Sequence, residues 1–172
     1  IFVPASVGAL LDRLDLIEKS KITGAKIIVP TGALLGLDAV RAAAEGKIYS
    51  VQMVTRKPPS GLKGAPYLDQ KNIDLDQLSE PLKLFSGPAR EAVQGFPANV
   101  NVAAALSLAG IGPDRTSIEI WADPGVTRNT HDIIVDSDSA KLTMRIENIP
   151  SKQNKRTGRI TALSILATLR GL

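Results

Sequence analysis

Two short apolar segments near the beginning of the chain constrain its fold most. Residues 1–5 and 26–29 are rich in strand-forming residues, and the stretch between them has the spacing of one short amphipathic helix that ends at Gly24. Asp12 is the predicted N-cap of that helix. A strand, a helix and a second strand at this spacing indicate a parallel crossover unit. The sequence therefore predicts an α/β protein that begins with part of a parallel sheet.

After residue 46 the pattern of strands and helices changes. Strands are predicted at residues 48–56, 81–86, 117–122, 132–135 and 141–146. Helices are predicted at residues 38–45, 87–95, 101–109 and 159–169. Hairpins or single helices separate these strands, which favours a mixed or antiparallel sheet with helices on one side. Residues 57–70 are rich in proline and glycine, and they are predicted to form a long irregular connection.

Periodicity also predicts which side chains face the core. Val51, Met53 and Thr55 should share one face of the strand at 48–56, because successive side chains alternate across a sheet. In the last predicted helix the apolar residues share one face, namely Ile160, Leu163, Leu166 and Ala167.

Composition excludes several classes of protein. The chain has 172 residues, of which 44% are hydrophobic, and it has no cysteine, which excludes disulfides, thiolate nucleophiles and cysteine-based metal sites. The net charge of +4 and the 3% of aromatic residues argue against a nucleic-acid partner. No segment approaches the roughly 20 apolar residues that cross a bilayer. We expect a cytoplasmic globular protein with no membrane, nucleic-acid or metal site.

His131 is the one histidine of the chain and lies where a predicted loop becomes a strand. An imidazole has an unperturbed pKa of about 6.5, so His131 is the natural proton carrier near neutral pH. A partly buried histidine with a structural role is the alternative interpretation.

Two loops follow the predicted crossover strands, at residues 6–10 and 31–35. In open α/β sheets, ligands bind outside the carboxyl ends of the strands. Ser6, Gly8 and Ala33 could therefore bring backbone N–H groups close to a cofactor. The chain has no Gly-x-Gly-x-x-Gly motif after a strand, so a bound dinucleotide would need its pyrophosphate turn from outside these residues.

An asparagine pair precedes the helix predicted at residues 101–109. Asn99 is expected to cap this helix, and Asn101 to lie in its first turn. A side-chain amide both donates and accepts hydrogen bonds, as a nicotinamide carboxamide or ribose requires. Asn101 is thus a second candidate for cofactor binding.

Eight segments, in order along the chain, resemble the L-aspartate dehydrogenase family, whose members join an N-terminal Rossmann domain to a C-terminal catalytic domain. They are SVGAL at 6–10, PTGAL at 30–34, TRKPP at 55–59, FSGPAR at 85–90, FPANVNV at 96–102, ADP at 122–124, TH at 130–131 and TAL at 161–163. The resemblance implies oxidative deamination of L-aspartate to oxaloacetate and ammonia through iminoaspartate, and the reverse amination, with NAD or NADP, as a step that feeds NAD biosynthesis. It assigns the acid/base role to His131 and cofactor contacts to Asn101 and the backbone N–H of Ala33.

The resemblance also divides the chain. Residues 1–36 would be the C-terminal remnant of a Rossmann domain, and residues 37–156 the catalytic, substrate-binding and oligomerisation domain. Residues 157–172 would form a closing helix that packs back on the Rossmann part. Because the glycine-rich nucleotide turn of the family is not in this sequence, we expect the 172 residues alone to be inactive. Apolar surface on the helices and the sheet predicts a homodimer or higher homo-oligomer.

Aspartate carries two carboxylates, so cationic side chains should face its pocket. The candidates are Arg56, Lys57, Arg128, Lys155 and Arg156. The last two belong to a basic stretch that would also suit a solvated loop.

Two other functions remain open. The first is another two-domain NAD(P)-dependent dehydrogenase or reductase, such as those acting on dihydrodipicolinate or homoserine. The asparagine pair at 99 and 101, together with Thr130 and His131, argues against it. The second is a non-catalytic dimerisation or ligand-sensing domain.

Overall fold

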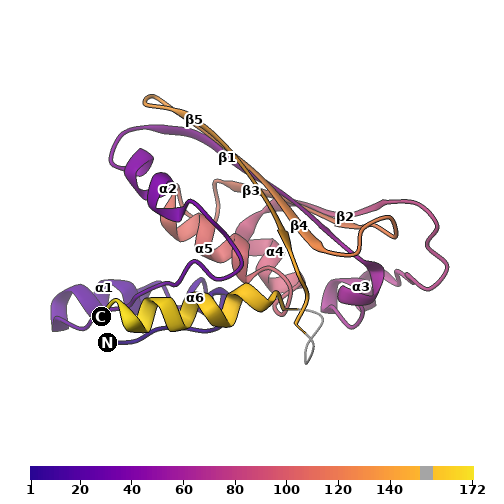
Figure 1. Cartoon of the computed structure of the whole chain (residues 1–172), viewed down its shortest axis with the longest axis horizontal. Helices are drawn as coiled ribbons and strands as arrows, with labels where there is room; N and C mark the ends of the chain where they lie inside the picture. The colour runs from indigo at the N-terminus through magenta and orange to yellow at the C-terminus, as the bar shows by residue number, and fades with distance from the viewer. Residues whose placement is uncertain (152–156) are drawn as a thin grey trace.

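The computed structural model describes residues 1–151 and 157–172 and is built on a five-stranded mixed sheet (Figure 1). The strands are β1 (Ile48–Lys57), β2 (Leu82–Pro88), β3 (Thr116–Ala122), β4 (Asn129–Ser137) and β5 (Lys141–Asn148). They lie in the order β2-β3-β1-β4-β5. Strands β1 and β3 pair in parallel, and every other neighbouring pair is antiparallel. This arrangement confirms the predicted mixed sheet.

The helices lie on one side of the sheet, as predicted (Figure 1). They are α1 (Asp15–Thr23), α2 (Leu37–Ala44), α3 (Pro66–Lys71), α4 (Ala89–Gly95), α5 (Asn101–Ala109) and α6 (Arg159–Arg170), with short 3₁₀ turns η1 (Val7–Leu10) and η2 (Pro59–Gly61). Helices α2, α4 and α5 lie close under the sheet, whereas α1 and α6 lie farther from it, near both termini. Over the described residues, no helix has the length and apolarity that a membrane span requires.

The core lies between the sheet and α5. Small side chains on α5, including Ala103, Ala104 and Ala105, are buried and let the helix approach its neighbours closely. The inner face of β1 contributes Val51 and Met53, as its alternation predicts. Thr55, the third residue predicted on this face, is also fully buried.

The first crossover is present, but in a reduced form. Phe2 and Ile27 make an isolated parallel bridge, with hydrogen bonds of 2.8 Å from Phe2 N to Lys26 O and 2.9 Å from Ile28 N to Phe2 O. The predicted parallel pairing is confirmed, but the two full strands predicted at residues 1–5 and 26–29 are wrong. Among the described residues neither segment has a second neighbour, and Phe2 is largely exposed, so no ladder extends from the bridge.

Three local predictions are wrong. Helix α1 begins at Asp15 and not next to Asp12; its N-cap is Leu14 without a side-chain bond, and the Asp15 carboxylate pairs with Arg13 at 2.9 Å. Asn99 does not cap α5, because its amide donates to Gly61 O at 2.6 Å instead.

The third concerns residues 57–70, which are more regular than predicted. Pro59 opens η2 and Pro66 opens α3. Proline suits the first turn of a helix, where its missing N–H has no partner to lose. The same prolines that suggested a loop therefore mark helix starts.

The apolar face of α6 has no cover in the described part of the chain. Ile160, Leu163 and Leu166 are 41%, 59% and 50% exposed. The other side of the helix, with Thr161 and Ile165, lines a pocket against the body of the domain.

Candidate active site

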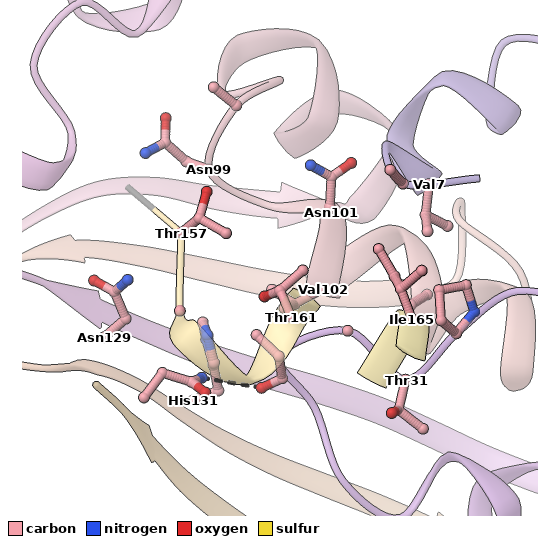
Figure 2. Close-up of a pocket in the computed structure, with 18 of the residues that line it drawn as sticks. Val7, Thr31, Asn99, Asn101, Val102, Asn129, His131, Thr157, Thr161 and Ile165 are labelled. Atoms are coloured by element: carbon pink, nitrogen blue, oxygen red, sulfur yellow. Dashed lines mark hydrogen bonds between the residues drawn. The ribbon is translucent and has the colours of Figure 1, made fainter. Parts of the chain in front are cut away.

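One pocket gathers most of the candidate residues (Figure 2). Its walls come from the loops at residues 5–7 and 30–33, from α5, from the ends of β1, β4 and β5, and from the start of α6. The segments are distant in sequence, and the sheet brings them together because β1, β4 and β5 are neighbours.

His131 lies in β4 with its ring at the pocket wall. It is directly opposite Thr55 of β1, and the Thr55 hydroxyl hydrogen-bonds to its Nδ1 atom. The side chain is only 2% exposed. Burial, and to a smaller extent the charge of Lys57, lowers the pKa of His131 from 6.5 to about 3. The imidazole is therefore neutral near pH 7.

Lys57 ends β1 on the same inner face as Thr55 and reaches the pocket wall. It is 2% exposed, and its Nζ donates to the backbone oxygen of Asn99 at 2.8 Å. Burial lowers its pKa from 10.5 to about 8. Most of the lysine is still charged at pH 7, yet none of the described lining residues is an aspartate or glutamate.

Buried carboxamides surround these two groups. Asn129 lies two residues before His131 and so on the same face of β4. Asn148 pairs with it across β4 and β5, and its Nδ2 donates to Ala33 O at 3.0 Å. Asn148 thereby ties the loop at residues 30–33 to the end of the sheet.

Asn101 connects the other loop to α5. Its Oδ1 accepts from Gly8 N at 2.9 Å and from Ser6 Oγ at 3.4 Å. Its Nδ2 has no hydrogen bond with another described residue, and the side chain lines the pocket, so Asn101 offers a ligand a donor (Figure 2). A Cβ on Gly8 would lie 2.9 Å from Val93 Cγ1, so this approach requires glycine.

The structure brings together four of the predicted site residues, namely Lys57, Ala33, Asn101 and His131. Ser6 and Gly8 contact Asn101 from behind and line an adjacent hollow. Lys155 and Arg156 lie outside the described residues.

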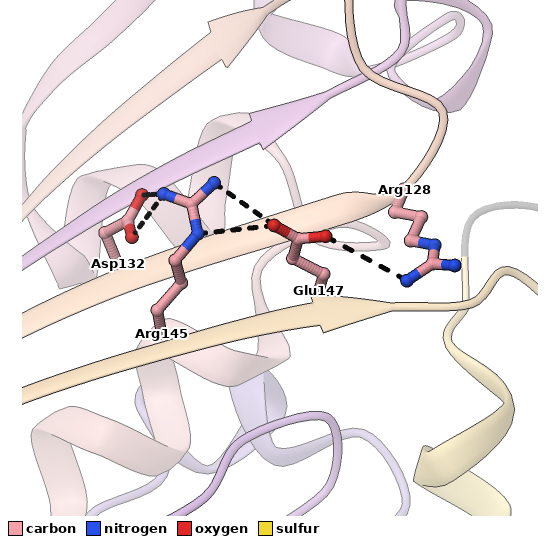
Figure 3. A network of polar contacts seen from close by, with 4 residues as sticks. All are labelled: Arg128, Asp132, Arg145 and Glu147. Atoms are coloured by element: carbon pink, nitrogen blue, oxygen red, sulfur yellow. Dashed lines mark hydrogen bonds and ion pairs between the residues drawn. The ribbon is translucent and has the colours of Figure 1, made fainter.

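Arg56 and Arg128 are not at the pocket. Strand alternation places Arg56 on the opposite face of β1 from Lys57, where its guanidinium pairs with Asp123 at 3.4 Å and lies 4.6 Å from the Trp121 ring centroid. Arg128 is 3.9 Å from Glu147 at the end of an exposed ionic network (Figure 3).

The network in Figure 3 continues across β4 and β5. Arg145 contacts Glu147 at 3.2 Å and Asp132 at 3.0 Å. Its members are exposed to solvent, where ion pairs contribute little to stability. These arginines therefore have acidic partners of their own on the sheet surface.

Sequence reasoning missed Thr55 as a partner of His131, and it missed Asn129, Asn148 and Thr161. Strand periodicity could have identified Asn129 from His131. The other three depend on strand register or helix docking, which the sequence does not display. Within residues 1–151 and 157–172, no group of three or more His, Cys, Asp or Glu side chains could hold a metal ion.

The fold and the pocket define a mixed α/β domain with a neutral buried imidazole and a buried lysine, suited to proton transfer on an anionic ligand. The family model "Aspartate dehydrogenase, C-terminal" matches residues 38–172, so the chain belongs to that family. This confirms the resemblance drawn from the eight sequence segments.

Individual relatives agree with the family match. The L-aspartate dehydrogenase of Bradyrhizobium diazoefficiens is 66% identical over 168 residues, which cover 98% of this chain and 60% of that protein. L-aspartate dehydrogenase 3 of Bordetella bronchiseptica is also 66% identical, over 96% of this chain and 60% of its own length. A crystal structure of aspartate dehydrogenase from Thermotoga maritima superposes with a TM-score of 0.77 at 28% identity, over 98% of this chain and 64% of that one. The chain thus spans about 60% of the length of these curated relatives.

Proposed function

We propose that this chain supplies the catalytic part of an L-aspartate dehydrogenase, which interconverts L-aspartate with oxaloacetate and ammonia through iminoaspartate, using NAD or NADP. The observation that carries the proposal is the buried pair of His131 and Lys57 at one pocket. A neutral imidazole and a cation without a carboxylate partner among the described lining residues match a substrate that carries two carboxylates and must exchange protons. The proposal places the enzyme in the cytoplasm and in NAD biosynthesis.

Lys57 is the proposed anchor for one carboxylate of the substrate. One of its three N–H donors bonds to Asn99 O, which leaves two for a ligand. A charged hydrogen bond to a carboxylate would also compensate the desolvation of the buried ammonium. Of the five cationic candidates, Lys57 lines the described pocket, whereas Arg56 and Arg128 do not. Lys155 and Arg156 stay proposals on sequence grounds alone.

His131 is the proposed group that exchanges protons with the substrate. Only a side chain that touches the reacting atoms can do so, and its ring lies at the pocket wall near Lys57. Its low pKa keeps it neutral over the whole neutral range. The imidazole therefore requires no prior deprotonation before it binds a substrate oxygen or nitrogen.

The loop and helix residues fit a nicotinamide group. Asn101 presents its Nδ2 donor because Gly8 and Ser6 occupy its oxygen. The Ala33 carbonyl is occupied by Asn148, while no described residue accepts from the Ala33 N–H. Two donors that line the same pocket suit the carboxamide oxygen and ribose oxygens of NAD or NADP. When bound, the nicotinamide would accept or deliver the hydride at the α-carbon.

A homodimer or higher homo-oligomer is part of the proposal. The sheet exposes apolar side chains, including Tyr49 of β1 and Ile134 of β4, and Ile134 lies two residues along β4 from Asp132 of the ionic network. Apolar surface rimmed by charged groups is typical of subunit contacts. Light scattering that gives a monomer mass at all concentrations would contradict this part of the proposal.

The test uses a protein in which the N-terminal part of the Bradyrhizobium diazoefficiens relative precedes this chain. We expect oxaloacetate- and ammonium-dependent oxidation of NADH or NADPH, and we expect His131→Ala to lower turnover by about 10²–10⁴-fold without loss of the fold. Leu142→Ala, on another part of the sheet, is a control for general damage. Near-normal turnover of His131→Ala would remove the residue from the mechanism, and oxaloacetate binding without turnover would favour a ligand-sensing domain.

A further inference from the structure

Thr55 and His131 form a buried polar pair on the inner face of the sheet. They lie directly opposite each other on β1 and β4, and the Thr55 hydroxyl meets Nδ1 of the imidazole. His131 lines the pocket and Thr55 does not. Nδ1 is therefore turned toward the sheet, and Nε2 is the ring nitrogen that can meet a ligand.

The position of the imidazole proton follows from counting donors and acceptors. A neutral imidazole carries one N–H, and a hydroxyl can donate or accept. If Nδ1 carried the proton, Thr55 would accept it, and the hydroxyl hydrogen would have no acceptor among the described residues, because the contact with His131 is the one side-chain hydrogen bond of Thr55 there. If Thr55 donates to Nδ1, both groups are satisfied. An unpaired buried donor costs about 1–3 kcal/mol, so the second arrangement is favoured.

The charges around the pair keep the imidazole neutral, so that it carries a single proton. Lys57 lies two residues along β1 on the same face, and its ammonium opposes a second proton on the ring. The other elements at the pocket present carboxamides and hydroxyls, such as Asn129, Asn148 and Thr161, and no described lining residue is acidic. A carboxylate at Nδ1 would hold the proton on that nitrogen. A threonine hydroxyl in its place allows the opposite tautomer.

We propose that Thr55 is a positioning residue that fixes His131 as the Nε2–H tautomer. The resting pocket then offers its ligand a hydrogen-bond donor from His131. To accept a proton from the substrate at Nε2, the ring must first change to the Nδ1–H form, in which the Thr55 hydroxyl accepts instead of donating. Such a donor fits an acceptor atom, for example the carbonyl oxygen of oxaloacetate. The identity of that ligand rests on the proposed function, whereas the tautomer does not.

The single histidine makes the test direct. In protein labelled with ¹⁵N-histidine, every imidazole nitrogen signal belongs to His131. A two-bond nitrogen–proton correlation spectrum separates a protonated ring nitrogen from an unprotonated one. We expect, at pH 7, an unprotonated Nδ1 and a protonated Nε2. The reverse pattern, or an equal mixture, would overturn the proposal without any variant.

Variants test the part played by Thr55. Thr55→Val keeps the shape and removes the hydroxyl, so we expect its spectrum to move toward a mixture of tautomers, while Thr55→Ser keeps the original pattern. Thr116→Val is the matched control, because Thr116 is also fully buried but donates to Gly112 O at 2.8 Å in another part of the fold. An unchanged tautomer in Thr55→Val, or an equal change in Thr116→Val, would show that Thr55 does not set it.

Kinetics separate this inference from the proposed function. If the enzyme aminates oxaloacetate, Thr55→Val should lower kcat about tenfold, the value of one hydrogen bond, and Thr55→Ser should restore it. A wild-type protein with the expected spectrum and no aspartate dehydrogenase activity would contradict the proposed function and leave the tautomer assignment standing. Full activity in Thr55→Val with an altered spectrum would show that the tautomer has no catalytic role.

Discussion

The protonation of His131 is coupled to the stability of the fold because the side chain is buried in its neutral form. Its pKa is lowered from 6.5 to about 3 in the folded chain. The unfolded chain therefore binds this proton at higher pH, so stability is complete above pH 6.5 and is lost as the pH falls toward 3. The full loss amounts to roughly 4–5 kcal/mol.

Urea unfolding of wild type and His131→Gln at pH 7 and pH 4 measures this coupling. The wild-type protein should lose about 3 kcal/mol more than the variant between the two pH values, because glutamine has no proton to gain. The remaining carboxylates titrate in both proteins and cancel in the comparison. Equal losses would mean that His131 does not stay buried and neutral.

Loss of the Lys57 proton should weaken substrate binding at alkaline pH. Its pKa is lowered to about 8, so the ammonium that holds a carboxylate is lost as the pH rises through that value. In titrations with oxaloacetate we expect affinity to weaken above pH 8. Lys57→Met should weaken binding about 10- to 100-fold at pH 7 and remove this dependence.

The control for this prediction is Lys141→Met, which removes an exposed lysine from β5. It should leave both the affinity and its pH dependence unchanged. If Lys57→Met retains the alkaline decline, another group is responsible for it.

The residue-level predictions from sequence succeeded where strand alternation or helix position was enough. Val51, Met53 and Thr55 share a buried face as predicted. The same alternation separates Lys57 from Arg56, although charge alone had placed both at the substrate. The contact between Thr55 and His131 could not be predicted. The two residues are 76 positions apart in sequence, and their contact depends on the register between β1 and β4.

At the level of elements, the docking of η1 on α5 positions the loop beside Asn101. A methyl group on Gly8 would lie 2.9 Å from Val93 Cγ1 and 3.2 Å from Asn101 Oδ1. We expect Gly8→Ala to destabilise the chain by about 1–3 kcal/mol, because a packed interface must shift to admit it. It should also displace the Asn101 amide and weaken nicotinamide binding.

Thermal unfolding and cofactor titration of Gly8→Ala check this prediction. Ala9→Ser changes the exposed neighbour in the same turn and should leave both measurements near wild type. A stable Gly8→Ala protein with normal cofactor affinity would show that η1 can move without cost, and that the Gly8–Asn101 contact is not part of the site.

Element prediction failed for a different reason at each place. The segments at 1–5 and 26–29 have strand-like composition, but a strand needs neighbours, and in the described residues each has only the other. Residues 66–71 form α3 although proline and glycine surround them, because Pro66 sits at a helix start. Long segments with strong periodicity, such as β1 and α5, were located almost to their ends.

On the scale of the whole molecule, the helical layer farthest from the sheet exposes many apolar side chains. The outer face of α6 is exposed, and so are Ile22 of α1 and the apolar residues at both termini. About 40% of the length of the Bradyrhizobium and Bordetella relatives lies outside the matched region. The predicted role of residues 157–172, packing on a nucleotide-binding part, is consistent with this surface and stays a prediction.

This surface and the pocket beside it lead to a prediction about cofactor binding. The described pocket supplies donors for the nicotinamide end, from Asn101 and Ala33, but the sequence has no glycine-rich turn for the pyrophosphate. In Rossmann domains that turn and a helix N-terminus hold the diphosphate. The nicotinamide contacts alone must offset an entropic cost of binding of roughly 4–15 kcal/mol.

We therefore expect the 172 residues alone to bind NADH or NADPH very weakly and to show no useful turnover. The protein extended by the N-terminal part of the Bradyrhizobium diazoefficiens relative should bind the reduced cofactor and aminate oxaloacetate. Fluorescence titration of both proteins with each reduced cofactor measures the difference, and circular dichroism of the short chain checks that it is folded. Asn101→Ala in the extended protein is the matched test that the nicotinamide end lies at this pocket, since it removes one donor and leaves the pyrophosphate contacts in place. Micromolar affinity of the folded short chain would mean that its own residues hold the whole dinucleotide, and that the nucleotide lies elsewhere than beside Asn101 and Ala33.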